Sequence, residues 1–249
     1  MILHGVDFSG ADAGGAAKIR MVSRDLAAPR NPIRQQGRFD RRGLVRRIVE
    51  LAADGGQHLV RIDAPFGLPL ETLRRAEVEP SWRAMAAWMA GFGSPRRWRS
   101  ELRQADRKEP RRVCDHAFQT PMAPMNLRVF KQTWTLIAEV LGPRVEAGIR
   151  VEPVMPGESS VTVCEGCPAS LLRLLGWPDH GYKGHGEPPR RVRADLLQRL
   201  GRTGVVVPRD MAEAAEADPE GDLLDAMLLT LDPLQCVPPA EALVEAWVY

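Results

Sequence analysis

Apolar positions at the start of the chain follow the pattern of a β-hairpin. Residues 2–7 are mainly apolar and end at Asp7, and a second strand-like segment covers residues 17–22. Glycines at positions 10, 14 and 15 lie between the two segments and suit a turn. The pattern therefore predicts two paired strands, the first of which ends at Asp7.

A helix and a further strand are predicted next. Between residues 40 and 53, apolar side chains recur at helical spacing, at Leu44, Val45, Ile48, Val49 and Leu51. Asp40 suits the N-cap of this helix, and glycines at 55 and 56 suit its end. Segment 58–63 is predicted to be a strand that ends at Asp63, because the proline at 65 cannot donate to a central ladder.

The rest of the chain adds helices and one more strand. Residues 80–145 have a mainly helical pattern with turn-rich breaks and are predicted to form a helical insertion. Beyond it we expect a strand at 161–164 that ends at Glu165, a short helix that begins at Pro168, and helices at about 190–200 and 221–228. This order predicts an α/β fold in which residues 1–249 form one domain, with the helical insertion at about 80–145.

Composition is typical of a globular protein of a reducing compartment. Of the 249 residues, 44% are hydrophobic and 27% are charged, and no stretch approaches the roughly 20 apolar residues that span a bilayer. The amino terminus carries no basic region or cleavage site of a signal peptide, so we expect a cytoplasmic protein with no membrane partner. Four cysteines in a chain of this length argue against a disulfide scaffold. The sequence does not indicate an oligomeric state.

The charge balance does not by itself identify a polyanionic partner. The formal net charge is only +2, and most of the positive charge is arginine, as a GC-rich genome would also encode. A basic stretch with an aromatic residue covers 95–112, but Glu101, Asp106 and Glu109 interrupt it. A solvated helix face with intrahelical ion pairs is therefore favoured there over a nucleic-acid groove.

Acidic residues occupy positions that suit a metal site. Asp7, Asp63 and Glu165 each end a predicted strand, and functional groups of open α/β sheets gather at the carboxyl ends of strands. In the last predicted helix, Asp222 and Asp225 are three residues apart and share one face. Carboxylates that converge raise one another's pKa unless a cation neutralises them, and Mg²⁺ or Mn²⁺ suits oxygen ligands. Two such ions would support phosphodiester hydrolysis, with Asp7 as the bridging ligand.

Each acid taken alone also has a structural explanation. Aspartates at strand ends form Asx turns or cap the next helix, and Asp222 suits the N-cap of the last predicted helix. This alternative stays open at the level of single residues.

Six segments resemble, in order, those of a known family. They are Gly5-Val6-Asp7, Ile62-Asp63-Ala64-Pro65-Phe66-Gly67-Leu68-Pro69, Arg112-Val113-Cys114-Asp115, Glu165-Gly166-Cys167-Pro168, Tyr182-Lys183-Gly184 and Asp222-Leu223-Leu224-Asp225-Ala226. Together they resemble domain-of-unknown-function family 429, a group regarded as predicted nucleases that are distantly similar to Holliday-junction resolvases. The resemblance implies an RNase H-like mixed sheet flanked by helices.

The resemblance also implies roles for single residues. By analogy with resolvase-type sites, it makes Asp7, Asp63, Asp222 and Asp225 metal ligands, and Glu165 a further ligand or a substrate contact. These five acids form the expected catalytic set.

Basic residues complete the implied site. Lys183, Arg191 and Arg193 are similar to the family's basic stretch and are expected to bind phosphate. Arg112, with Asp115 beside it, is expected to lie toward the site and to contact substrate.

The leading hypothesis is a metal-dependent nuclease or phosphodiesterase that uses Mg²⁺ or Mn²⁺, with nucleic acid as the candidate partner. One alternative is a phosphotransferase or phosphohydrolase that acts on a nucleotide or small phosphorylated molecule, in which the glycine-rich turn after Asp7 would cradle phosphate. Another is a non-catalytic interaction module, which a failure to bind metal would favour.

Residues 164–185 also contain cysteines and histidines with the spacing of a zinc finger. Cys164 and Cys167 precede His180 and His185 at a suitable separation. Glycines and a proline surround the two histidines, however, and these residues suit a helix interior poorly. Burial of the cysteines as small hydrophobic residues is therefore favoured over zinc binding.

Overall fold

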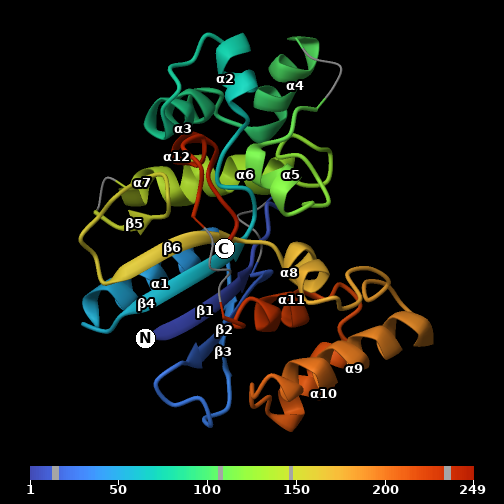
Figure 1. Ribbon diagram of the computed structural model, residues 1–249. Helices are drawn as coiled ribbons and strands as arrows, with labels where there is room; N and C mark the ends of the chain where they lie inside the picture. Colours follow the sequence, from blue (N-terminus) through green and yellow to red (C-terminus); the bar gives the residue numbers. More distant parts are fainter. Residues whose placement is uncertain (13–16, 106–108, 146–147, 233–236) are drawn as a thin grey trace.

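The structure, a computed structural model, describes residues 1–12, 17–105, 109–145, 148–232 and 237–249. Its centre is a six-stranded sheet with the strand order β3-β2-β1-β4-β6-β5 (Figure 1). The strands of this sheet are β1 (Ile2–Asp7), β2 (Ile19–Asp25), β3 (Arg34–Phe39), β4 (His58–Asp63), β5 (Arg150–Val151) and β6 (Val161–Gly166).

The sheet is mixed. β1 pairs with β2 in antiparallel fashion, as β2 does with β3, whereas β1, β4, β6 and β5 run parallel to one another. The β1–β2 pair confirms the predicted hairpin, although β2 continues to Asp25. With helices on its faces, the sheet gives the α/β, RNase H-like class expected from the sequence.

The first helix, α1 (Arg41–Ala53), links the antiparallel part of the sheet to β4. Its N-cap is Asp40, whose side chain accepts a hydrogen bond of 2.6 Å from the backbone nitrogen of Gly43. Beyond its carboxyl end, Gly55 adopts a φ of +78°. Both ends therefore lie where the capping pattern predicts them.

Helices fill the chain between β4 and β5. They are α2 (Leu70–Arg75), α3 (Trp82–Gly91), α4 (Pro95–Ala105), α5 (Val113–Ala117), α6 (Phe130–Thr135), the π-helical segment η2 (Leu136–Leu141) and α7 (Gly142–Val145). This segment matches the helical insertion predicted at about 80–145, and α2 precedes it. The organisation of the chain as one domain stays a prediction.

Helices also follow β6. They are α8 (Pro168–Leu174), α9 (Glu187–Arg202), α10 (Arg209–Ala217), α11 (Asp222–Leu228) and α12 (Ala242–Glu245). The start of α8 at Pro168 was predicted, whereas α10 and α12 were not. No helix among the described residues is both long and apolar enough to cross a bilayer.

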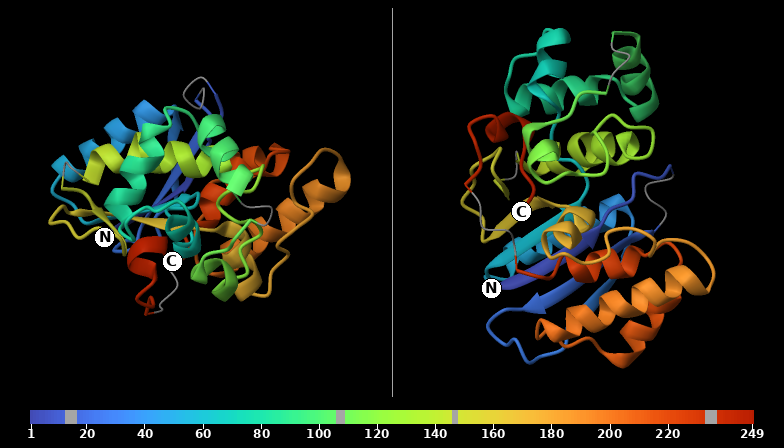
Figure 2. Two further views of the ribbon diagram at one scale, coloured as in Figure 1. Left: turned by 90° about the horizontal axis from the view of Figure 1, so that it is seen from above. Right: turned by 45° about the vertical axis from the view of Figure 1, so that its right-hand side comes forward.

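The two faces of the sheet belong to different hydrophobic clusters. On one face, Val6 and Ile62 share a cluster with Leu44 and Ile48 of α1 and with residues of α6 and η2. On the other face, α11 lies across β1 and β2, and α9 and α10 pack outside it (Figure 2). Residues on successive positions of a strand point to opposite faces, so the sheet supplies side chains to both clusters.

Candidate metal centre and its cleft

Two of the expected metal ligands stand on neighbouring parallel strands. Asp7 is the last residue of β1, Asp63 is the last residue of β4, and the two are register partners. Partners in a parallel pair point to the same face of the sheet, so their carboxylates lie side by side. Asp7 is only 8% exposed.

Helix α11 supplies a third carboxylate. Its close approach to β1 depends on Gly5, where an added Cβ would lie 2.1 Å from the carbonyl oxygen of Ala226. This packing brings Asp225, which is 1% exposed, to the two strand ends. One carboxylate oxygen from each of Asp7, Asp63 and Asp225 lies within 4.8 Å of the other two. These three side chains form a group that could hold a metal ion.

Asp222 lies beside this group and lines the same cleft. It is the first residue of α11, and Gly221 rather than Asp222 occupies the N-cap position. After burial, the charge of Asp222 is the next largest cause of the raised pKa of Asp7. The structure thus places four of the five acids singled out in the sequence around one cleft.

The loop between α8 and α9 adds a cation and a hydroxyl group. The ammonium nitrogen of Lys183 lies 2.7 Å from Oδ2 of Asp225, and the hydroxyl of Tyr182 donates to Oδ1 at 2.9 Å. Both oxygens of Asp225 therefore have a partner. Tyr182 is buried, whereas half of the Lys183 side chain is exposed.

Burial raises the pKa of all four acids, and the charges of neighbouring aspartates raise it further. Burial is the largest cause for Asp7, whose pKa lies well above its ordinary value, followed by the charges of Asp222 and Asp225. Burial and the Asp225 charge raise the pKa of Asp63 to about 7. Burial also raises the pKa of Asp225, against the opposing effects of Lys183 and Tyr182. At neutral pH this cluster therefore favours protons or an added cation.

Without divalent metal, stability should fall as the pH rises through the titration range of Asp63. Its folded pKa of about 7 lies above the ordinary 3.8, so between these values the folded state holds a proton that the unfolded state releases. This contribution is fully present below about pH 4 and is lost toward about pH 7. Asp63→Asn should remove the dependence and gain about 1–3 kcal/mol relative to wild type between about pH 5 and pH 7.5.

Urea unfolding in EDTA, at about pH 5 and about pH 7.5, measures the stability that Asp63→Asn gains relative to wild type. Comparing the two proteins cancels the titration of groups distant from the cluster, so the difference reports on Asp63 and the acids that interact with it. Parallel pH profiles for wild type and Asp63→Asn would contradict the prediction.

The four acids line a cleft of about 920 Å³, a volume typical of a small-molecule or nucleotide site. Basic residues line the same cleft, namely Lys18, Arg128, Lys131, Arg173 and Lys183. The cleft therefore combines a carboxylate cluster with cations that could bind an anion.

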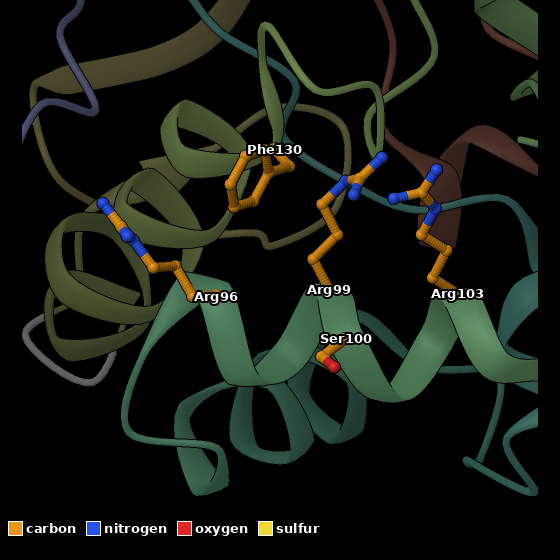
Figure 3. A pocket seen from close by; sticks show the side chains of 5 residues that line it. All are labelled: Arg96, Arg99, Ser100, Arg103 and Phe130. Atoms are coloured by element: carbon orange, nitrogen blue, oxygen red, sulfur yellow. The ribbon is translucent and has the colours of Figure 1, made fainter.

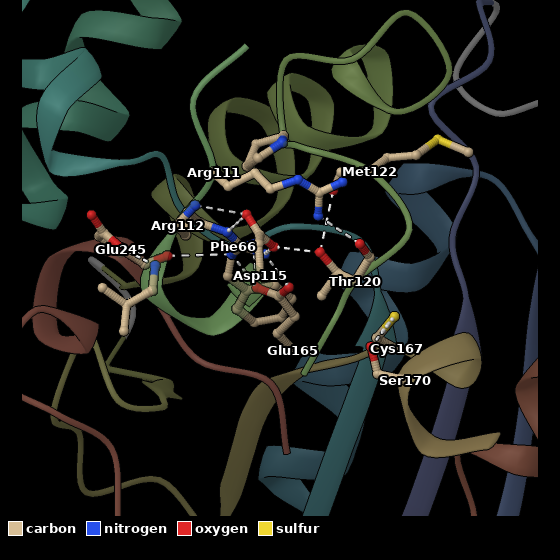
Figure 4. Close-up of polar contacts among 12 residues, drawn as sticks. Phe66, Arg111, Arg112, Asp115, Thr120, Met122, Glu165, Cys167, Ser170 and Glu245 are labelled. Carbon is tan, nitrogen blue, oxygen red and sulfur yellow. Dashed lines mark hydrogen bonds and ion pairs between the residues drawn. The ribbon is translucent and has the colours of Figure 1, made fainter. Parts of the chain in front are cut away.

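Glu165, the fifth acid, belongs to a separate buried network (Figure 4). Its two oxygens accept hydrogen bonds of 2.6 Å each from the guanidinium of Arg112, and one of them also accepts from the backbone of Phe66. Arg112 donates in addition to both oxygens of Asp115, at 2.9 and 3.2 Å. The exposed fractions of Arg112 and Asp115 are 1% each, so in this structure the guanidinium is closed off from a substrate.

The register of β6 explains where Glu165 points. Gly166 rather than Glu165 is the register partner of Asp63, and Glu165 pairs with Ile62. Because side chains alternate between faces, Glu165 points away from the carboxylate group. The predicted strand ended at Glu165, whereas β6 continues to Gly166. This offset of one residue places the side chain of Glu165 on the face opposite to that of Asp63.

The two arginines of α9 that were expected to bind phosphate, Arg191 and Arg193, differ in surroundings. Arg193 is 3% exposed and donates to the backbone carbonyls of Tyr182 and Gly184, at 2.6 and 3.2 Å. It thereby fixes the loop that carries Lys183. Arg191 is exposed and pairs with Glu187 at 3.1 Å. The structure brings neither guanidinium to the carboxylate group.

Residues 5–232 match the family described as "Protein of unknown function (DUF429)". The chain belongs to this family. No curated protein and no solved structure matches it.

Within the described part of this DUF429 chain, the cysteines and histidines do not assemble into a metal-binding group. Burial raises the pKa of Cys164 and of Cys167 to about 12, so both thiols stay protonated at neutral pH. His180 is exposed and pairs with Asp179. Cys164 is buried, as favoured for the pair, whereas Cys167 is partly buried and lines the cleft. Cys236 lies outside the described residues.

Several cleft residues of the DUF429 chain were not singled out in the sequence. Tyr182 stands next to Lys183 in a segment of the family resemblance, and that adjacency was the available signal. Arg128, Lys131 and Arg173 lie on helices and loops whose placement over the sheet depends on tertiary packing. The spacing of these residues along the chain does not predict that they line the cleft.

Proposed function

We propose that this DUF429 chain is a metal-dependent hydrolase of phosphodiester bonds that acts on nucleic acid, that is, a nuclease. The observation that carries this proposal is the convergence of Asp7, Asp63 and Asp225, from two strands and one helix, within 4.8 Å of one another. Asp222 beside them would complete the ligand set.

The donor chemistry of the cluster fits Mg²⁺ or Mn²⁺. All its ligands are carboxylate oxygens, which hard divalent cations prefer. Burial is the largest cause of their raised pKa values, and repulsion between neighbouring carboxylates adds to it at Asp7 and Asp63 despite the charge of Lys183. An added divalent cation would relieve this repulsion.

When bound, Mg²⁺ or Mn²⁺ supplies the charge that activates water and stabilises the leaving oxygen in an in-line displacement. Tyr182 would hold the Asp225 carboxylate in place, since its hydroxyl donates to Oδ1. Lys183 lies on the other oxygen of Asp225 with half of its side chain exposed, so its ammonium could also contact a phosphate oxygen.

Cations on the cleft wall would orient the substrate. Arg128 is exposed, and Lys131 and Arg173 are partly exposed. Phosphodiesters carry a negative charge at neutral pH, so these side chains would bind them and hold the scissile bond near the carboxylates.

A cleavage assay on a labelled panel tests the proposal. The panel comprises single strands, duplex, RNA–DNA hybrid, hairpin and four-way junction, each with Mg²⁺, Mn²⁺ or EDTA. We expect cleavage of at least one substrate with metal, none in EDTA, and loss of cleavage in Asp7→Asn. Equal activity in wild type and Asp7→Asn would overturn the assigned site.

Absence of cleavage in both proteins would also overturn the proposed nuclease. Binding of Mn²⁺ without cleavage would then favour the alternative of a small phosphorylated substrate. Absence of Mn²⁺ binding would favour the non-catalytic module.

Tyr182→Phe should weaken Mn²⁺ binding about 10-fold to 100-fold, because groups that orient metal ligands have effects of this size. The variant removes only the hydroxyl that donates to Asp225. Isothermal titration with Mn²⁺ measures the change, and the thermal midpoint in EDTA checks the fold. Unchanged Mn²⁺ affinity would contradict the positioning role of Tyr182.

A further inference from the structure

Helix α4 carries a row of arginines on one face. Arg96, Arg99, Ser100 and Arg103 have the spacing that places side chains together along a helix. Figure 3 shows the three guanidinium groups leaving α4 on the same side, with Phe130 of α6 opposite. Together these residues line a hollow of about 500 Å³.

The other side of α4 fixes its position. Trp98 and Leu102 are 0% and 8% exposed and belong to the main hydrophobic cluster. Glu101, one of the acids that interrupt the basic stretch, lines a different cavity. The acidic interruptions seen in the sequence therefore do not all share the arginine face.

Two acids do lie against this face. Asp12 pairs with Arg96 at 3.1 Å, and Glu109 pairs with Arg99 at 3.2 Å. The Arg96–Asp12 pair is exposed on both sides, at 72% and 67%, and such pairs contribute little free energy. Arg96 could therefore exchange Asp12 for a phosphate at small cost. Arg103 is exposed as well.

The arginine face continues into the cleft that holds the carboxylates. Asp12 contacts both Arg96 and Lys131, at 3.1 and 3.0 Å. Lys131 lines the cleft, and its neighbour Phe130 lines the hollow on α4. The hollow on α4 and the cleft therefore adjoin at Asp12, whose carboxylate pairs with Arg96 of the hollow and Lys131 of the cleft.

We propose that this arginine face docks the sugar-phosphate backbone of a nucleic acid whose scissile bond lies in the cleft. The inference rests on the proposed function and names its substrate as an oligonucleotide rather than a small phosphodiester. Arg96 and Arg103 are seven residues apart, about 10 Å along a helix, which corresponds to about three nucleotides of a B-form strand. A substrate confined to the cleft would not use these cations, whereas a chain of phosphates would.

A binding measurement tests the docking surface without catalysis. Fluorescence anisotropy of a labelled oligonucleotide in EDTA compares wild type with Arg96→Glu/Arg103→Glu. We expect affinity to fall at least about tenfold, and the slope of log affinity against log salt to decrease by about 1–2, because two phosphate contacts are lost. The matched control, Arg74→Glu/Arg97→Glu, reverses the same charge at exposed positions outside the hollow and should stay within about threefold of wild type.

The outcomes separate this inference from the proposed function. Equal loss in both double variants, no loss in either, or no binding by wild type would overturn the docking surface. Cleavage of bis(para-nitrophenyl) phosphate by wild type tests hydrolysis separately. Selective loss of oligonucleotide binding without any hydrolysis by wild type would support the surface and overturn the hydrolase.

Discussion

Asp7→Asn should lower metal-dependent phosphodiester cleavage by about 10²–10³-fold, since loss of a ligand removes several kcal/mol of charge stabilisation. Asp7 is the central candidate because Asp63 is its register partner and Asp222 and Asp225 both act on its pKa. Asparagine keeps the size of the side chain and removes the negative charge. The effect should therefore fall on metal binding and cleavage rather than on packing.

Stability distinguishes this role from a structural one. In EDTA, Asp7→Asn should be at least as stable as wild type, because asparagine avoids the cost of ionising a buried carboxyl group among like charges. Asp12→Asn is the matched control, since Asp12 is 67% exposed and pairs with Arg96 and Lys131 outside the carboxylate group. A marked loss of thermal stability in Asp7→Asn would contradict the assignment of Asp7 as a ligand.

Arg112→Met should lower the free energy of unfolding by about 3–5 kcal/mol, the cost of breaking a buried ion-pair network. The substitution leaves the carboxylates of Glu165 and Asp115 without their shared cation, and both are nearly inaccessible to water. Arg112 also donates to the backbone carbonyl of Glu245, which links this network to α12. The loss should therefore affect the contact between the helical segment and the end of β6.

Denaturant unfolding measures this effect against Arg111→Met. Arg111 is exposed and donates to backbone carbonyls of Thr120 and Pro121, so its replacement should cost about 1 kcal/mol or less. Adding Glu165→Gln to Arg112→Met should recover part of the loss, because one unpaired charge disappears. Equal stabilities of the Arg111 and Arg112 variants would contradict the account.

Local signals in the sequence predicted the elements that depend on local chemistry. Asp40 caps α1 as its position suggested, Pro168 begins α8, and the strand ends at Asp7 and Asp63 lie where the pattern put them. The gathering of these acids follows from a general property of parallel strands. Because side chains alternate between the two faces of a sheet, the face to which each acid points follows from its position within its strand.

Features that depend on tertiary packing could not be predicted from the sequence pattern. β3 is polar and lies at the edge of the sheet, so it lacks the apolar alternation that marks a half-buried strand. Glu165 was expected near the metal because β6 was taken to end one residue early, and its side chain instead meets Arg112. The approach of Tyr182 to Asp225 depends on the loop between α8 and α9, which Arg193 holds through the backbone carbonyl of Tyr182.

The close packing of α11 on β1 at Gly5 has a consequence for folding. The carboxylates of Asp7, Asp63 and Asp225 come together only when segments from both ends of the chain have docked. A cation bound by all three would stabilise the native state alone, by about 2.7 kcal/mol at a hundredfold excess over its dissociation constant. Contacts of such long sequence separation form late and slow the search for the native state. Cation affinity in this protein would therefore report on completed assembly of the chain, so that a partly folded intermediate would show none.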